Sequence, residues 1–193
     1  ADSYEFNRET GWIDATGKVR VQYRGMVLEA EHVRVNRETK NVEATDDIYF
    51  YTLETPETPE IEKRFFWRGE KLKGNFDTGH FEIGPHFAGV GQWYEKGKQA
   101  VRLPTGKVVF RNVSFSTCEY LTDDHSHYSV TARKLVYTPR GRLRAYNSVV
   151  RMGSVPVFYW PYFTWDTDES GGNLSIDAGV DGDWGAYLLM GRR

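Results

Sequence analysis

The sequence predicts an all-β protein, a β-jelly roll in which repeated strand-turn-strand units fold one sheet over on itself. Three observations predict it: apolar and polar residues alternate with a period of two, a strand-turn-strand pattern recurs, and the alternation slips by one residue inside each copy. Aromatic residues make up 15% of the chain and glycines number 19, which suits packed strands joined by tight turns. We expect about a dozen short strands.

Alternation of apolar and polar residues is the strongest local signal. Val19, Val21 and Tyr23 alternate with polar neighbours, and Phe81 and Ile83 do the same further along the chain. A period of two places the apolar side chains on one face of a strand. This pattern is typical of an antiparallel sheet with one face covered and the other in water.

A strand-turn-strand unit occurs three times, which indicates a stacked architecture. In each copy a small residue is followed three positions later by an apolar one: Ala30 and Val33, Gly69 and Leu72, Ala132 and Leu135. This spacing interrupts strict alternation, and such a slip turns later side chains to the opposite face unless the backbone bends. We therefore predict a corner in every unit. Corners in register would fold the sheet into a V or jelly roll with an apolar trough inside.

Composition excludes several classes of protein. The formal net charge of -2 gives no general attraction to phosphate backbones, so we expect no nucleic-acid partner. No run of about 18 apolar residues is present that would form a transmembrane helix. The chain begins at Ala1 without a signal peptide, which predicts a mature or trimmed form. The single cysteine, Cys118, is either a free thiol or has a partner outside this sequence.

Two parts are expected along the chain. Residues 1–153 contain the repeats and form the jelly-roll domain, and residues 154–193 form a C-terminal part. From Leu174 onward the residues alternate as a hairpin, which we expect to be the truncated start of something larger. Pro156 and Pro161 interrupt an aromatic run with the pattern of a strand, and each removes a backbone donor. They predict either a weakly paired seam or an edge strand with a bend.

Three segments of the chain resemble one known family. Residues 27–50 look like the repeat of OstA-like periplasmic domains, and Ser116, Thr117 and Cys118 look like that family's Thr-Cys step. Residues 155–163, Val-Pro-Val-Phe-Tyr-Trp-Pro-Tyr-Phe, are similar to the segment with which the family passes from its periplasmic domain into its barrel. The sequence thus resembles the OstA-like family of lipopolysaccharide-assembly proteins.

This resemblance implies a function in lipopolysaccharide transport and assembly at the cell outer membrane, with residues 1–153 in the periplasm. An apolar groove would receive the acyl chains of lipid A and pass them to an outer-membrane β-barrel, whose junction and first strands would be residues 154–193. The implied partners are lipopolysaccharide, a periplasmic bridge protein of the same repeat type and an outer-membrane lipoprotein plug of the LptE type. By the same resemblance, Cys118 would form a disulfide with a cysteine near the far end of the barrel, and Pro156 and Pro161 would mark the barrel junction.

The expected groove is lined by inward-facing apolar residues from all parts of the jelly roll. The candidates are Val33, Val35, Ile48, Phe50, Trp67, Leu72, Phe81, Ile83, Phe110, Phe115, Leu135, Tyr137 and Val149. A groove shields about 0.8 kcal/mol per CH₂ of an acyl chain from water without binding any one position tightly. Inward alternation alone also produces a closed hydrophobic core, so both interpretations stay open.

Other residues carry weaker signals. Metal ligands crowd together at Cys118, Asp123, Asp124, His125 and His127, but their spacing fits no common zinc pattern, so we expect no metal and no cofactor. We find no Ser-His-Asp arrangement and expect no enzymatic activity. Two rival functions remain: a free-standing lipopolysaccharide-bridge protein, and a carbohydrate-binding jelly-roll module whose aromatic side chains stack on sugars.

Overall fold

The protein is an all-β molecule, described here in a computed structural model. The structure describes residues 1–53, 65–90, 93–117, 128–166, 174–181 and 185–192. Its strands are β1 (Ser3–Phe6), β2 (Trp12–Tyr23), β3 (Met26–Asn36), β4 (Asn41–Thr52), β5 (Phe66–Asn75), β6 (His80–Ile83), β7 (His86–Val90), β8 (Trp93–Arg102), β9 (Val108–Ser116), β10 (Tyr128–Thr138), β11 (Arg142–Met152), β12 (Val155–Asp166), β13 (Leu174–Asp181) and β14 (Gly185–Arg192). The predicted fold class is confirmed. No helix long and apolar enough to cross a membrane occurs among these residues.

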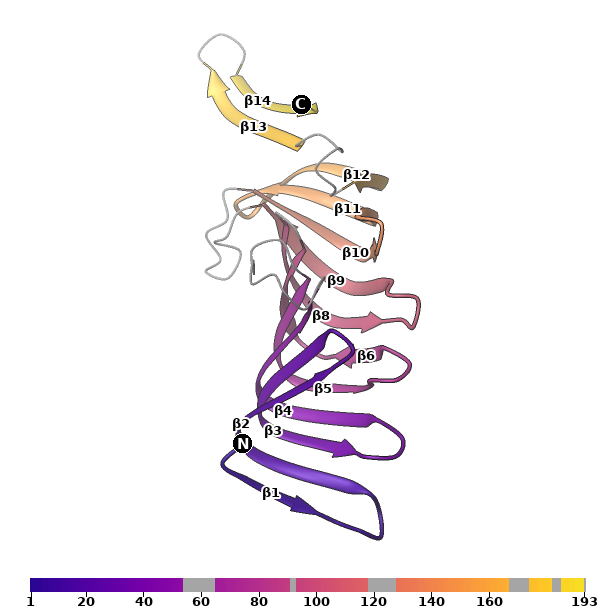
Figure 1. The fold of residues 1–193 in the computed structure, drawn as a ribbon. Coiled ribbons are helices and arrows are strands. Elements are labelled where there is room, and N and C mark those ends of the chain that lie inside the picture. Colours follow the sequence, from indigo (N-terminus) through magenta and orange to yellow (C-terminus); the bar gives the residue numbers. More distant parts are fainter. Residues whose placement is uncertain (54–64, 91–92, 118–127, 167–173, 182–184, 193) are drawn as a thin grey trace.

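Strands β1 to β12 form a single antiparallel sheet of 12 strands, in which each strand except β6 and β7 lies beside its neighbours in sequence. Figure 1 shows the hairpins stacked one after another from β1 to β12. Strands β6 and β7 act as one interrupted strand: β5 pairs with β6 through Leu72 and Ile83, and with β7 through Gly69 and His86. The interruption lies between Ile83 and His86. The sheet is therefore a stack of hairpins with only local connections.

The predicted corners are present, and the burial pattern locates them. Ala132 and Leu135 are buried, whereas Arg133 and Lys134 between them are exposed. Two consecutive outward residues mean that the strand bends at this point and that inward alternation resumes one position later. The same position in β11 is occupied by Asn147, opposite Arg133 in the pairing of β10 with β11. Each corner thus continues across the neighbouring strands.

Residues with positive φ produce the bend in alternate strands. They share φ values between 44° and 66° and are Lys18, Asp46, Asp47, Asn112 and Asn147. The pairing register shifts beside the first three, between Thr16 and Val19 and between Thr45 and Ile48. A left-handed residue is the usual means of inserting a bulge and turning a strand sharply. Asparagine and aspartate tolerate this conformation better than most residues.

The corners divide the sheet into two arms that face each other across the interior. We call residues 19–30, 48–52, 65–69, 86–90, 93–97, 113–116, 128–132 and 148–160 the first arm, and the strand segments beyond the corners the second arm. One hydrophobic cluster fills the space between the arms and contains residues from β2 through β11. Phe50 of the first arm and Phe81 of the second have ring centroids 4.6 Å apart. The interior is therefore continuous along the stacking direction.

The sheet extends past the expected boundary at residue 154. Strand β12 pairs with β11 from Val155 to Asp166, whereas β13 and β14 form a separate two-stranded sheet. Pro161 lies opposite Asn147, at the corner, and the register shifts beside Pro156. Both prolines thus occupy irregular positions of the last strand of the sheet. The assignment of residues 154–193 to a barrel junction stays a prediction.

Substitutions at Asn112 test whether the corners depend on residues with positive φ. This exposed residue has a φ of 51°, so Asn112→Val forces a β-branched residue into the left-handed region. We expect the variant to lose about 1–2 kcal/mol of unfolding free energy, whereas Asn112→Gly should change it by less than about 0.5 kcal/mol. Urea unfolding of the three proteins measures the difference. Equal effects of valine and glycine would show that the corner does not depend on positive φ.

Candidate functional site

The structure brings most of the predicted lining residues together in the interior between the arms. Those with an exposed fraction of at most 3% are Val33, Ile48, Phe50, Trp67, Leu72, Phe81, Ile83, Phe110, Phe115 and Leu135. Val35 and Tyr137 are half-buried and pack against the same cluster. These residues come from six strands and from both arms, because the corners return each strand to the same interior.

Val149 requires a correction, because it lies on the outer face. Its neighbours Ser148 and Val150 are buried, and Val150 belongs to the interior cluster. Val149 pairs with Thr131, which lines a hollow on the outside of the sheet. The corner at Asn147 shifts the alternation by one residue, so the inward positions after it are 148 and 150.

The arms are closed on each other in this structure. Phe50 packs against both Phe81 and Trp67, with ring centroids 4.6 and 5.7 Å apart. Phe76 in the loop between β5 and β6 also contacts Phe81 edge-on at 5.4 Å. The interior therefore has the packing of a hydrophobic core, in which the lining side chains contact one another.

Contacts between the tips of the two arms close the rim of the V. The Tyr23 hydroxyl donates a 2.5 Å hydrogen bond to Asp77 Oδ1, and Arg24 lies 3.4 Å from the same carboxylate oxygen. The hydrogen bond to Asp77 raises the pKa of Tyr23 above 10.0. Further along, Phe65 of the first arm stacks on Tyr137 of the second with ring centroids 6.4 Å apart. We call these side chains the rim contacts.

A buried polar pair interrupts the apolar interior, and it has no counterpart in the sequence-based prediction. The His86 and Glu95 side chains are 0% and 3% exposed, and His86 Nε2 lies 2.9 Å from Glu95 Oε2. The approach is close enough for an ion pair but is not directed along a hydrogen bond. A Cβ at Gly97 would lie 2.3 Å from Glu95 Oε1, so this glycine provides the room for the carboxylate. The signal in the sequence that could have revealed the buried pair is the alternation of β8, which places Glu95 on the inward face with Trp93 and Gly97.

The proton arrangement of this pair follows from its second contact. His86 Nδ1 lies 2.7 Å from the carbonyl oxygen of Gly84, and a carbonyl only accepts, so Nδ1 carries a hydrogen. The other ring nitrogen, Nε2, therefore faces Glu95. Burial raises the pKa of Glu95 above 4.5, and the neighbouring His86 opposes this shift. The imidazole and the carboxyl therefore compensate each other in an otherwise apolar interior.

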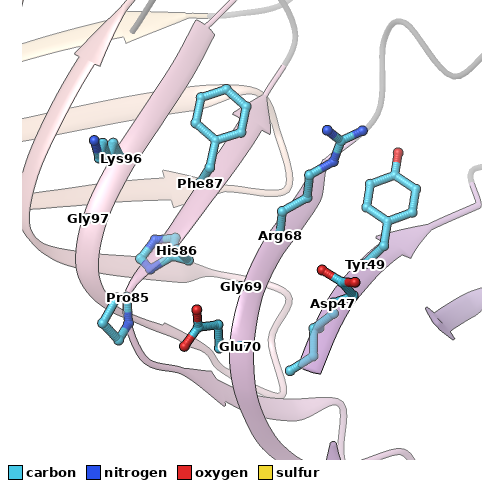
Figure 2. Close-up of a pocket in the computed structure, with 11 residues that line it drawn as sticks. Asp47, Tyr49, Arg68, Gly69, Glu70, Pro85, His86, Phe87, Lys96 and Gly97 are labelled. Atoms are coloured by element: carbon cyan, nitrogen blue, oxygen red, sulfur yellow. The ribbon is translucent and has the colours of Figure 1, made fainter. Parts of the chain in front are cut away.

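The outer face of the first arm carries aromatic and charged side chains around a hollow of about 790 Å³. Figure 2 shows Tyr49 and Phe87 on either side of Arg68, with Glu70 and Lys96 nearby. The Arg68 guanidinium lies 5.1 Å from the centre of the Tyr49 ring. These side chains alternate with the buried ones on β4, β5, β7 and β8. We call this feature the outer hollow.

At the last strand of the sheet, apolar side chains remain uncovered. Phe158 and Trp160 continue the inward-facing rows of β11, and their exposed fractions are 50% and 38%. On the other face, Val157 and Tyr159 are also exposed. Phe163 of the second arm contacts Phe115 and Trp160 at 6.1 and 5.8 Å. The apolar interior is thus continuous with an open surface at β12.

Several predicted features lie outside the described residues. These are Cys118, with its expected disulfide, and the polar residues Asp123, Asp124, His125 and His127. In the part of the chain that is described, no three histidine, cysteine, aspartate or glutamate side chains are grouped so that they could hold a metal ion.

The buried carboxyl generates a prediction about pH. Because the pKa of Glu95 is raised in the folded state, its proton stabilises the fold fully below about pH 4.5, and this contribution is lost as the pH rises through the raised value. Besides His86, the side chains facing it from β5 and β9, Trp67 and Phe115, are uncharged. As the pH is raised above about 4.5, we expect Glu95→Gln to lose less unfolding free energy than the wild type.

Urea unfolding across this range measures the effect, and Glu70→Gln on the exposed face of β5 is the matched control. The control should follow the wild type. An unchanged slope in Glu95→Gln would contradict the prediction.

The comparisons with known proteins give one partial match. A segment of 71 residues is 35% identical to the LPS-assembly protein LptD of Coxiella burnetii (strain RSA 493 / Nine Mile phase I). It covers 37% of this chain and 8% of that protein, so the chain matches only a small part of the relative's length. No protein-family model matches the chain. The sequence is thus similar, over about a third of its length, to part of a lipopolysaccharide-assembly protein.

Proposed function

We propose that this chain guides lipopolysaccharide at the cell outer membrane by holding its acyl chains between the two arms. The observation that carries the proposal is the continuous apolar interior, which runs through the stacked strands from β2 to β11 and meets exposed aromatic side chains at β12. The similarity to LptD supports the choice of cargo. No catalytic step is part of this proposal.

Entry of an acyl chain requires the arms to separate, and the architecture makes this separation possible. Backbone hydrogen bonds in the sheet run from strand to strand along the stack, so they do not connect one arm to the other. Separation would break the rim contacts, such as Tyr23 with Asp77, and would expose the packed side chains. An acyl chain inserted between the arms would restore that apolar contact, at about 0.8 kcal/mol for each buried CH₂.

The direction of transfer follows from the ends of the stack. We propose that a periplasmic bridge protein of the same repeat type delivers the cargo at β1, and that acyl chains leave along Phe158 and Trp160 of β12 toward an outer-membrane barrel with its lipoprotein plug. Pro156 and Pro161 reduce the backbone donors of this edge strand. These partners rest on the likeness to lipopolysaccharide-assembly proteins.

Photo-crosslinking tests the lipid path directly. A photoreactive side chain at Val21 or Val35, which are half-buried on the first and second arms, should capture lipopolysaccharide. The same group at Arg20 or Lys73, exposed on the outer face, should capture at least about tenfold less because no apolar path lies there. Gel shifts detected with a lipopolysaccharide antibody measure capture. Equal capture on both faces, or none at Val21 and Val35, would reject the interior path.

A locked variant is the control for opening. Phe65→Cys and Tyr137→Cys, in a Cys118→Ser background, place two thiols where the rings now stack. Bridging them with a short bismaleimide should hold the arms together and remove capture at Val35. Each single cysteine variant treated with the same reagent should capture normally.

The outer hollow favours a second candidate function for this chain, which is carbohydrate binding. Tyr49 and Phe87 are half-buried beside Arg68 and Glu70, and aromatic faces with nearby charged groups are suited to bind sugar rings. Under this candidate, the wild type would give signals on a glycan array that fall at least about tenfold in Tyr49→Ala. An array with no signals above background would exclude it. Lys73→Ala, away from the hollow, is the control.

A further inference from the structure

The apolar interior contains a group of buried polar atoms that the lipid path does not use. Among the described residues, no hydrogen-bond partner exists for Trp67 Nε1, Trp93 Nε1 or Glu95 Oε1, and the only polar atom near His86 Nε2 is Glu95 Oε2 at 2.9 Å. All four side chains are at least nine-tenths buried. We call these four residues the polar cluster. Buried polar groups in folded proteins are almost always paired, so such a concentration calls for a function.

The pairing of the strands places the four residues of the cluster near Ala88 on the inner face of the sheet. Trp67 on β5 and Glu95 on β8 both pair with Ala88 on β7, from its two sides. Directly paired residues have side chains on the same face about 5 Å apart. His86 lies two residues before Ala88 on that face, and Trp93 lies two residues before Glu95. The small side chain of Ala88 is therefore flanked by Trp67, His86 and Glu95, and Trp93 lies diagonally across from it on β8.

The chemistry of the cluster restricts what it can bind. Trp67 and Trp93 offer indole N–H groups, which only donate. His86 Nε2 faces Glu95 Oε2 at 2.9 Å, and Oε1 of Glu95 remains available to hydrogen-bond. A group that both accepts and donates satisfies this set, whereas a phosphate would bring uncompensated negative charge into the interior. A plain hydrocarbon would leave every atom of the set unsatisfied.

We infer that the polar cluster binds a hydroxyl group carried on an acyl chain inside the interior, and so selects hydroxylated acyl chains over plain ones. This inference rests on the proposed function, because it requires acyl chains between the arms. The hydroxyl oxygen accepts from an indole N–H, and its hydrogen is donated to Glu95. The surrounding rings of Trp67 and Phe110, which lie 6.3 and 5.8 Å from the His86 ring, contact the adjoining methylenes.

The experiment compares two probes that differ by one oxygen, tetradecanoic acid and 3-hydroxytetradecanoic acid. Binding is followed by the intrinsic fluorescence of the chain and by displacement of a fluorescent fatty acid. We expect the wild type to bind the hydroxylated probe about tenfold tighter, the difference made by one or two buried hydrogen bonds. The double variant His86→Leu with Glu95→Leu should bind both probes with equal affinity.

Replacing a buried charged pair by apolar residues of similar size commonly preserves the fold, and circular dichroism checks this. Glu95→Gln keeps hydrogen-bonding atoms and should retain part of the preference even if the double variant does not fold. Lys73→Ala, on the exposed outer face of β5, leaves the polar cluster intact and should retain the full preference.

The outcomes separate this inference from the proposed function. If neither probe binds, the lipid path itself fails. If both bind equally to the wild type, the interior carries lipid but the polar cluster does not select a hydroxyl, and the inference is overturned. A preference that persists in the folded double variant would also overturn it, because the selecting group would lie elsewhere.

Discussion

The fold depends on one backbone constraint. In neighbouring strands, two consecutive residues face the solvent at corresponding positions along the strand. At Arg133 and Lys134 this pair reverses the phase of the alternation, so the residues on both sides of the corner point into one interior. Asn112 and Asn147, with φ of 51°, give the flanking strands the matching bend. Without the corners, the same sequence of hairpins would form an extended sheet with one apolar face in water. The interior, the rim contacts and the polar cluster all require the two arms that the corners produce.

The sequence was sufficient to predict the corners because the small residue and the next apolar residue, as at Ala132 and Leu135, are spaced by three. The prediction from the sequence was wrong at Val149. There the left-handed conformation of Asn147 shifts the alternation of inward and outward residues by one, and the hydrophobicity of the sequence does not reveal this conformation. The His86–Glu95 pair was missed for a different reason: two charged types in separate strands give no periodic signal, and only the register of β7 with β8 brings them together. The sequence also could not predict that the arms are closed on each other, because an open groove and a packed core give the same alternation of inward apolar residues.

The interior combines tight apolar packing, which stabilises the closed arms, with buried polar groups, which destabilise them. Its aromatic packing, as between Phe50 and Phe81, stabilises the closed arms, while each unsatisfied buried polar group in the polar cluster destabilises them by about 1–3 kcal/mol. Natural proteins retain such groups chiefly where they serve a purpose other than stability. The cluster lies in the first arm, at the strands beside the interruption between β6 and β7. The least regular part of the sheet is therefore also the most polar part of its interior.

The strictly sequential pairing of the strands has a consequence for how such a molecule can evolve. The backbone of each strand lies close mainly to that of its immediate neighbours, so backbone pairing accumulates one unit at a time, as in solenoid proteins. Adding or deleting a hairpin would then lengthen or shorten the apolar interior while leaving its width and side-chain chemistry unaltered. A chain built this way can change its length in steps of one repeat, with no redesign of the remaining ones.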